Sequence, residues 1–86
     1  MFGGELKQIE LQFNFDMLDD IYDEFGEDIR IIKAGEDTHR CNVEIQISPT
    51  FFSWFAGTRG KVKILTPNTV REQFEEFVRE IAKAYI

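Results

Sequence analysis

SPTFFSWFAGTRGKVKIL, residues 48–65, holds the strongest local signals for the fold. Ser48 followed by Pro49 is typical of a helix N-terminus, and Gly57 is placed to end that helix. Residues 61–65 alternate between lysine and apolar side chains until the leucine, and Pro67 follows. This segment therefore predicts a short helix, a glycine-bounded turn and a strand.

Period-two and helical patterns alternate in the residues that precede this segment. Apolar side chains alternate with polar ones at Ile9, Leu11, Phe13 and Phe15, which predicts a strand with one buried face. Asp16 is placed to cap a helix that ends at Gly26. The apolar residues of that helix are Met17, Leu18, Ile21, Tyr22 and Phe25.

Two further strands and a long final helix complete the predicted order. Residues 29–34 and 40–48 read as a hairpin around the turn 35–37. After Pro67, Thr69 and Glu72 have capping-box spacing. The apolar stripe predicted for the last helix consists of Val70, Phe74, Phe77, Val78, Ile81 and Tyr85.

The order β-α-β-β-α-β-α predicts an α+β, ferredoxin-like domain. In that arrangement a four-stranded antiparallel sheet carries two helices on one face, and the last helix is an addition. The 86 residues suffice for one domain only. We expect residues 1–7 to be a flexible start or linker remnant.

Charge is distributed unevenly along the chain, whose net charge is −6. Residues 1–44 carry −8, whereas residues 45–70 hold three bases and no acid. This balance disfavours a general polyanion-binding role, but Arg59, Lys61 and Lys63 form a local cationic strip that is a possible anion or ligand contact. With the fourth strand beside the first, Lys61 and Lys63 are expected near Glu10 and Gln12.

The predicted open face of the sheet carries polar side chains and no ring. Its residues on the two central strands are Glu10, Gln12, Asn14, Asn42, Glu44 and Gln46. RNA-recognition sheets stack bases on aromatic side chains at such positions, so this class of binder is disfavoured.

Four aromatic rings crowd the short helix. Phe51, Trp54 and Phe55 share one side at helical spacing, and Phe52 lies apart from them. One sheet cannot cover both sides. Either all four rings complete the core of the domain, or some of them form an interface with a partner, and we expect the interface.

The residue types in the chain limit which cellular compartment and which catalytic chemistry can be expected. A single cysteine, Cys41, allows no intrachain disulfide, and the chain has neither a signal-peptide pattern nor 18 consecutive apolar residues. We therefore expect a cytoplasmic protein with no membrane partner. His39 and Cys41 make at most two metal ligands, the acids of residues 16–28 fit a solvated helix face, and no catalytic set stands out. We expect no enzyme activity, no metal and no cofactor.

The order of motifs resembles the C-terminal extension, often called WCX, of WYL-domain transcriptional regulators. The residues that match the family pattern are Trp54, Gly57, Gly60, Val62, Ile64, Pro67, Phe74 and Tyr85. The likeness extends from Ile9 to the end of the chain. In the family the turn after the tryptophan helix often holds an aromatic residue between two glycines, whereas here Thr58 and Arg59 stand between Gly57 and Gly60.

The resemblance implies a non-catalytic dimerisation and effector-response domain that forms part of a longer regulator. In such regulators a winged helix binds operator DNA, so we expect no direct DNA contact here. The WYL barrel senses a ligand, often proposed to be a nucleotide or nucleic acid. The expected partners are a second copy, that barrel and a ligand shared with it. The alternative is a free-standing ferredoxin-like domain that senses an anion or small molecule at Arg59, Lys61 and Lys63.

Overall fold

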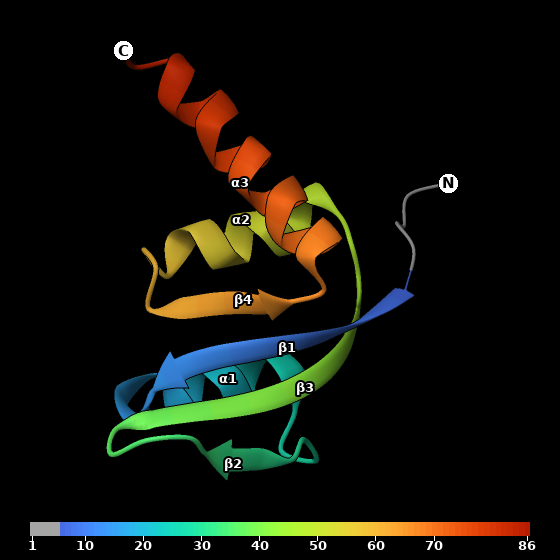
Figure 1. Ribbon diagram of the computed structural model, residues 1–86, viewed down its shortest axis with the longest axis vertical. Helices are drawn as coiled ribbons and strands as arrows, with labels where there is room; N and C mark the ends of the chain where they lie inside the picture. Colours follow the sequence, from blue (N-terminus) through green and yellow to red (C-terminus); the bar gives the residue numbers. More distant parts are fainter. Residues whose placement is uncertain (1–5) are drawn as a thin grey trace.

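The computed structural model describes residues 6–86. The elements follow the predicted order, with one 3-10 turn added after the first strand (Figure 1). They are β1 (Leu6–Asn14), η1 (Phe15–Met17), α1 (Leu18–Phe25), β2 (Ile31–Lys33), β3 (Thr38–Gln46), α2 (Pro49–Gly57), β4 (Val62–Thr66) and α3 (Asn68–Lys83).

One four-stranded sheet organises the domain, with the strand order β2-β3-β1-β4. Every neighbouring pair is antiparallel. Consequently β1 runs parallel to β2 with β3 between them, and β3 runs parallel to β4 with β1 between them. These two split β-α-β units agree with the predicted α+β, ferredoxin-like arrangement.

The core lies between one face of this sheet and the helices. The inward residues of the strands are Ile9, Leu11, Phe13, Cys41, Val43, Val62 and Ile64, and all are buried. The helices and η1 cover them with Met17, Ile21, Phe51, Phe52, Phe55 and Val70. The strand parity predicted from the alternating pattern is therefore confirmed. Glu10 and Gln12 lie on the opposite face with the other polar residues.

The start of the first helix differs from the prediction. Phe15, expected on the buried face of the strand, lies in η1 and is 61% exposed. Pairing with β3 stops at Asn14, and the Phe15 N–H then donates to the Asp37 carbonyl at 3.0 Å. Asp16 lies inside η1, and the residue before α1 is Met17, which makes no side-chain cap. The chain turns before the alternation in its sequence ends.

Other boundaries shift by a few residues. Strand β1 begins at Leu6, so residues 6 and 7 are not a flexible linker, and residues 1–5 of that expected segment lie outside the described residues. Strand β3 occupies Thr38–Gln46 instead of residues 40–48, and β2 is only three residues long. Strand β4 starts at Val62, which leaves Lys61 just outside it.

Helix α2 begins and ends as predicted. The Ser48 hydroxyl oxygen accepts a hydrogen bond from the Phe51 N–H at 3.2 Å, and Pro49 follows in the first turn. Gly57 is the last helical residue. The turn into β4 then places Arg59 at φ 56° and Gly60 at φ 85°, so two consecutive residues adopt the left-handed conformation.

Helix α3 follows β4 directly and extends away from the body of the domain (Figure 1). It begins at Asn68, with Pro67 in the preceding position and no side-chain cap. Thr69 therefore lies in the first turn, and the predicted capping box with Glu72 is wrong. The helix starts here through backbone hydrogen bonds, because the Val70 and Arg71 N–H groups both donate to the Pro67 carbonyl at 3.1 Å.

Candidate functional site

The aromatic residues of α2 belong mainly to the core. Phe51, Phe52 and Phe55 are buried, and only Trp54 is partly exposed. The expected interface at these four positions is therefore wrong for the three phenylalanines. These phenylalanines are buried because α3 packs against the side of α2 that the sheet does not reach.

Ring contacts show how α3 provides this cover. The Phe52 ring centroid lies 5.6 Å from that of Phe74 and 5.5 Å from that of Phe77. On the other side of α2, Phe51 and Phe55 meet edge to face at 4.5 Å. Such tilted and edge-to-face pairs are the favoured aromatic geometries. Both sides of α2 are therefore covered by other residues of the same chain.

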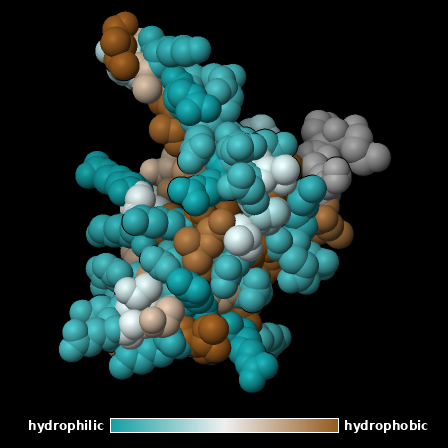
Figure 2. Space-filling model, viewed as in Figure 1, coloured by the Kyte–Doolittle hydropathy of each residue, from teal (hydrophilic) through white to brown (hydrophobic). Residues whose placement is uncertain are grey.

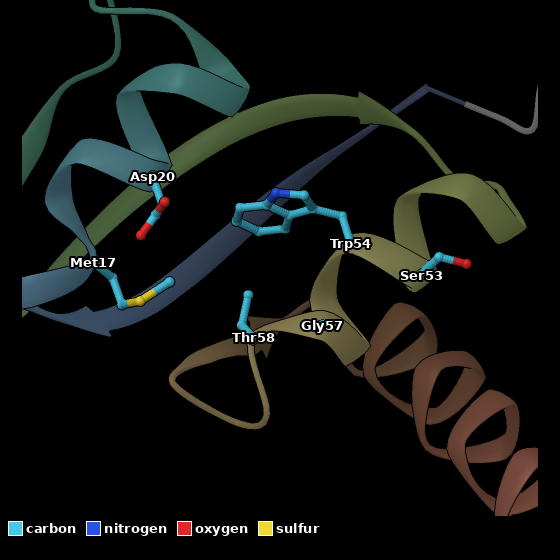
Figure 3. A pocket seen from close by; sticks show the side chains of 6 residues that line it. All are labelled: Met17, Asp20, Ser53, Trp54, Gly57 and Thr58. Carbon is cyan, nitrogen blue, oxygen red and sulfur yellow. The ribbon is translucent and has the colours of Figure 1, made fainter.

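Trp54 borders a hollow between α1 and α2. Its ring meets Phe25 at 5.3 Å and Phe55 at 5.1 Å, both edge to face. The hollow has a volume of about 350 Å³, and Figure 3 shows Asp20, Met17 and Thr58 on the side of the indole ring, with Ser53 pointing away. Gly57 completes the lining. One carboxylate facing one ring offers a small contact surface and no catalytic set.

The last turns of α3 expose the same apolar face that packs on the body. Val70, Phe74 and Phe77 contact the core, and three- and four-residue spacings continue that face toward the C-terminus. There Val78 is 41% exposed and Ile81 47%, and Tyr85, in the turn that follows the end of α3 at Lys83, is 88% exposed. We call these three residues the α3 stripe. Figure 2 shows hydrophobic atoms at the far end of this helix.

Charged residues occupy the rest of the α3 surface. Arg71 pairs with Glu75 at 3.6 Å and Arg79 with Glu76 at 3.0 Å, all at exposed positions. Such pairs contribute only about 0.5 kcal/mol each. These ion pairs matter through their position. They keep the solvent face of the helix polar, so the α3 stripe is a defined apolar surface.

The cationic strip lies at the turn between α2 and β4 and along the open face of β4. Arg59, Lys61 and Lys63 line one hollow of about 280 Å³ together with Gln12, Phe13, Asn14 and Gly60. The structure therefore brings together the three bases predicted from the sequence. No ion pair involves them among residues 6–86.

Strand register adds a fourth cation that the sequence analysis did not include. Lys63 lies opposite Gln12, as expected, and Gln12 lies opposite Arg40 in β3. The Arg40 Nε–H donates to Gln12 Oε1 at 3.4 Å. The prediction that a lysine lies opposite Glu10 is wrong. A register shift between Glu10 and Leu11 places Thr66 opposite Glu10. Alternation alone could place Arg40 on the open face, but only the register sets it in line with Lys63.

His39 and Cys41 are two residues apart in β3, so their side chains point to the same face of the sheet, but they do not form a reactive pair. The His39 ring stacks on Phe13 at 6.0 Å between centroids, and its Nδ1 is buried without a hydrogen-bond partner. Cys41 is 2% exposed, and burial raises the pKa of its thiol to about 11. A thiol in this state is protonated near neutral pH and a poor nucleophile.

Neither a metal-binding cluster nor a membrane-spanning helix occurs among residues 6–86. Within residues 6–86, no three His, Cys, Asp or Glu side chains are grouped as a metal site. No helix in the same range has the length and apolar character needed to cross a membrane. Comparison with protein-family models, curated proteins and solved structures finds no match to this chain. The resemblance to WYL regulators therefore rests on the sequence pattern.

Proposed function

We propose that this chain is a non-catalytic interaction domain that self-associates through the α3 stripe. We further propose that it acts in the cytoplasm as the dimerisation and effector-response extension of a WYL-type transcriptional regulator. The observation that carries the self-association is the continuity of α3. One apolar face packs on the domain in the first half of the helix and is exposed in the second half.

An amphipathic helix with half of its apolar face in water is suited to pairing with a second copy. Large exposed apolar patches on soluble domains usually mark interaction surfaces. Two copies related by a two-fold axis present the same stripe to each other. The α3 stripe is smaller than a standard interface of about 1,600 Å², so the isolated domain should associate weakly. The WYL barrel of the parent regulator would supply further contact area.

In the parent regulator, pairing through this domain would set the distance between two DNA-reading winged helices. The domain itself is not proposed to touch operator DNA. Its net charge is −6, and the open faces of β1 and β3 present no aromatic side chain on which bases could stack.

Sedimentation or light scattering over a wide range of protein concentration tests the self-association. Ile81→Glu places a charge in the α3 stripe, and Lys83→Gln changes the net charge by the same amount at an exposed position on the opposite side of the helix. We expect the first variant to remain monomeric and the second to associate like the unmodified chain. Equal association of all three proteins, or a monomer at every concentration, would contradict the proposal.

A second candidate function is anion sensing at the cationic strip. It is favoured by the hollow that joins Arg59, Lys61 and Lys63, and by the alignment of Lys63 with Arg40. Guanidinium and ammonium groups donate charge-assisted hydrogen bonds to phosphate and carboxylate oxygens. A nucleotide shared with the barrel, or a small anion bound by a free-standing domain, would have suitable chemistry.

Thermal unfolding in the presence of nucleotides and short oligonucleotides tests this second function. A ligand that binds only the folded domain raises Tm by an amount that grows with its excess over Kd. Lys63→Ala should reduce the increase, whereas Lys33→Ala on the opposite edge of the sheet should not. A Tm that does not respond to any of these ligands argues against anion sensing.

A further inference from the structure

A groove runs between β4 and the first turns of α3. Its volume is about 420 Å³, and Val62, Lys63, Ile64 and Leu65 form one wall. Arg71, Phe74 and Glu75 of α3 form the other. Successive side chains of a strand point to opposite faces of the sheet. Four consecutive residues can line one groove only along the edge of the strand, so the groove gives access to the β4 edge.

This edge has backbone groups without strand partners. Strand β4 is the last strand of the sheet, and β1 pairs with it on one side only. On the other side no strand among residues 6–86 completes the ladder. The N–H and C=O groups that point outward are therefore able to pair with an added strand, which is a common mode of peptide recognition.

The side chains along the edge indicate the chemistry of such a strand. Phe74 gives the groove an apolar wall, while Lys63 and the neighbouring Arg59 and Lys61 make the open-face side cationic. Arg71 is already paired with Glu75. A segment with alternating residues would direct apolar side chains toward one face and acidic ones toward the three unpaired bases.

We propose that the β4 edge binds an extended segment of a partner protein that alternates apolar and acidic residues, adding it to the sheet as a fifth strand. A second copy of β4 is a poorer occupant, because it would bring two identical cationic rows together and like charges across strands are destabilising. A nucleic acid would satisfy the bases but cannot complete the backbone ladder. This proposal is independent of self-association through α3.

The test uses the ¹⁵N-labelled chain with Ile81→Glu, so that self-association through the α3 stripe does not contribute. The probe is a capped peptide that alternates valine and glutamate over about seven residues, a typical strand length. We expect it to shift the amide signals of Val62–Leu65 and to slow hydrogen exchange at alternate residues of β4. Replacing glutamate by lysine in the peptide should abolish these changes.

Matched variants of the domain separate the charge contribution from the backbone ladder. Lys63→Glu should weaken binding about five- to tenfold, since it replaces an attraction by a repulsion, whereas Lys33→Glu on the far edge strand β2 should leave Kd unchanged. A peptide N-methylated on alternate amides keeps its charges but cannot form the ladder, and it should not bind.

Three results would overturn the proposal. Equal binding of the N-methylated peptide would show an anion site without strand addition. Perturbation by a short single-stranded oligonucleotide, with no protection of β4 amides by the peptide, would assign the strip to nucleic acid. No shift with the acidic peptide at millimolar concentration would mean that Lys63 only protects the edge from pairing, a frequent role of edge lysines.

Discussion

The ring centroids of Phe52, near the centre of α2, and Phe77, near the middle of α3, lie 5.5 Å apart. This contact covers the aromatic side chain that lies apart from the rest of the α2 cluster. Phe77 is also the last residue of α3 that packs on the hydrophobic core, and Val78 and Ile81 after it are exposed. One helix therefore completes the core and presents a new apolar surface.

Phe52 should contribute strongly to folding. Removal of a buried phenylalanine ring typically costs about 3 to 5 kcal/mol, so Phe52→Ala should lower the urea midpoint sharply. Phe15→Ala, at an exposed position, should cost about 1 kcal/mol or less. Circular dichroism during urea titration measures both. A Phe52→Ala midpoint close to that of Phe15→Ala would mean that α3 does not cover α2 in solution.

Two of the three predicted helix caps, Ser48 and Thr69, should differ in energy. Ser48 accepts a hydrogen bond from the Phe51 N–H, and loss of such a cap costs about 1 kcal/mol. Thr69 makes no capping hydrogen bond, so Thr69→Ala should change the free energy of unfolding by less than about 0.5 kcal/mol. Chemical denaturation of Ser48→Ala and Thr69→Ala compares them directly. Equal losses would contradict the assigned start of α3.

Gly57, the last residue of α2, and Gly60, in the turn that follows, should respond in opposite directions to replacement by alanine. A Cβ at Gly57 or Gly60 would meet no atom within 4 Å, but Gly60 has φ 85°. Gly57→Ala should stabilise by about 0.5 to 1 kcal/mol through a less flexible unfolded chain. Gly60→Ala should destabilise by about 1 kcal/mol, because a Cβ disfavours the left-handed conformation. Thermal unfolding of the two variants should move Tm to opposite sides of the parent value, and shifts of the same sign would count against the turn geometry.

Cys41 should make stability depend on pH in alkaline solution. Burial raises the pKa of its thiol from 9.0 to about 11, so the unfolded chain loses this proton at a lower pH than the folded domain does. The stabilisation from the neutral buried thiol is complete below pH 9 and is lost as the pH rises toward about 11.

Urea titrations between these pH values, with Cys41→Ala as the control, measure this effect. The decline in the free energy of unfolding should be steeper for the parent chain than for the variant, in which the thiol is absent. Parallel declines would show that the thiol does not contribute. Slow reaction of native Cys41 with a thiol reagent at neutral pH is a second readout of the same burial.

Local patterns in the sequence were sufficient to predict most elements of the fold. Alternation predicted the inward residues of β1 and β3, and Ser48 with Pro49 predicted the start of α2. These signals act over a few residues, through side-chain direction and backbone capping. Where a local signal competed with strand pairing, it failed. Phe15 continues the alternation of β1, but the ladder with β3 stops at Asn14 and the chain turns.

The candidate site was harder to predict because it depends on elements distant in sequence. Arg59, Lys61 and Lys63 could be grouped from the sequence, since residues two positions apart in a turn and strand remain close in space. Arg40 was not predicted, because it reaches the strip only through the register of three strands. The interface was expected on α2, because no local pattern indicates which helix will cover Phe52.

The sequence by itself determined the element types, the buried parity of the strands, and the separation of an acidic half from a basic segment. These properties follow from side-chain spacing, capping and composition. Only the tertiary structure decided that the α2 rings are core, that the second half of α3 is exposed, and that β4 has an accessible edge. Burial and exposure are set by which surfaces meet when the sheet and helices assemble, and those contacts join residues far apart in the chain.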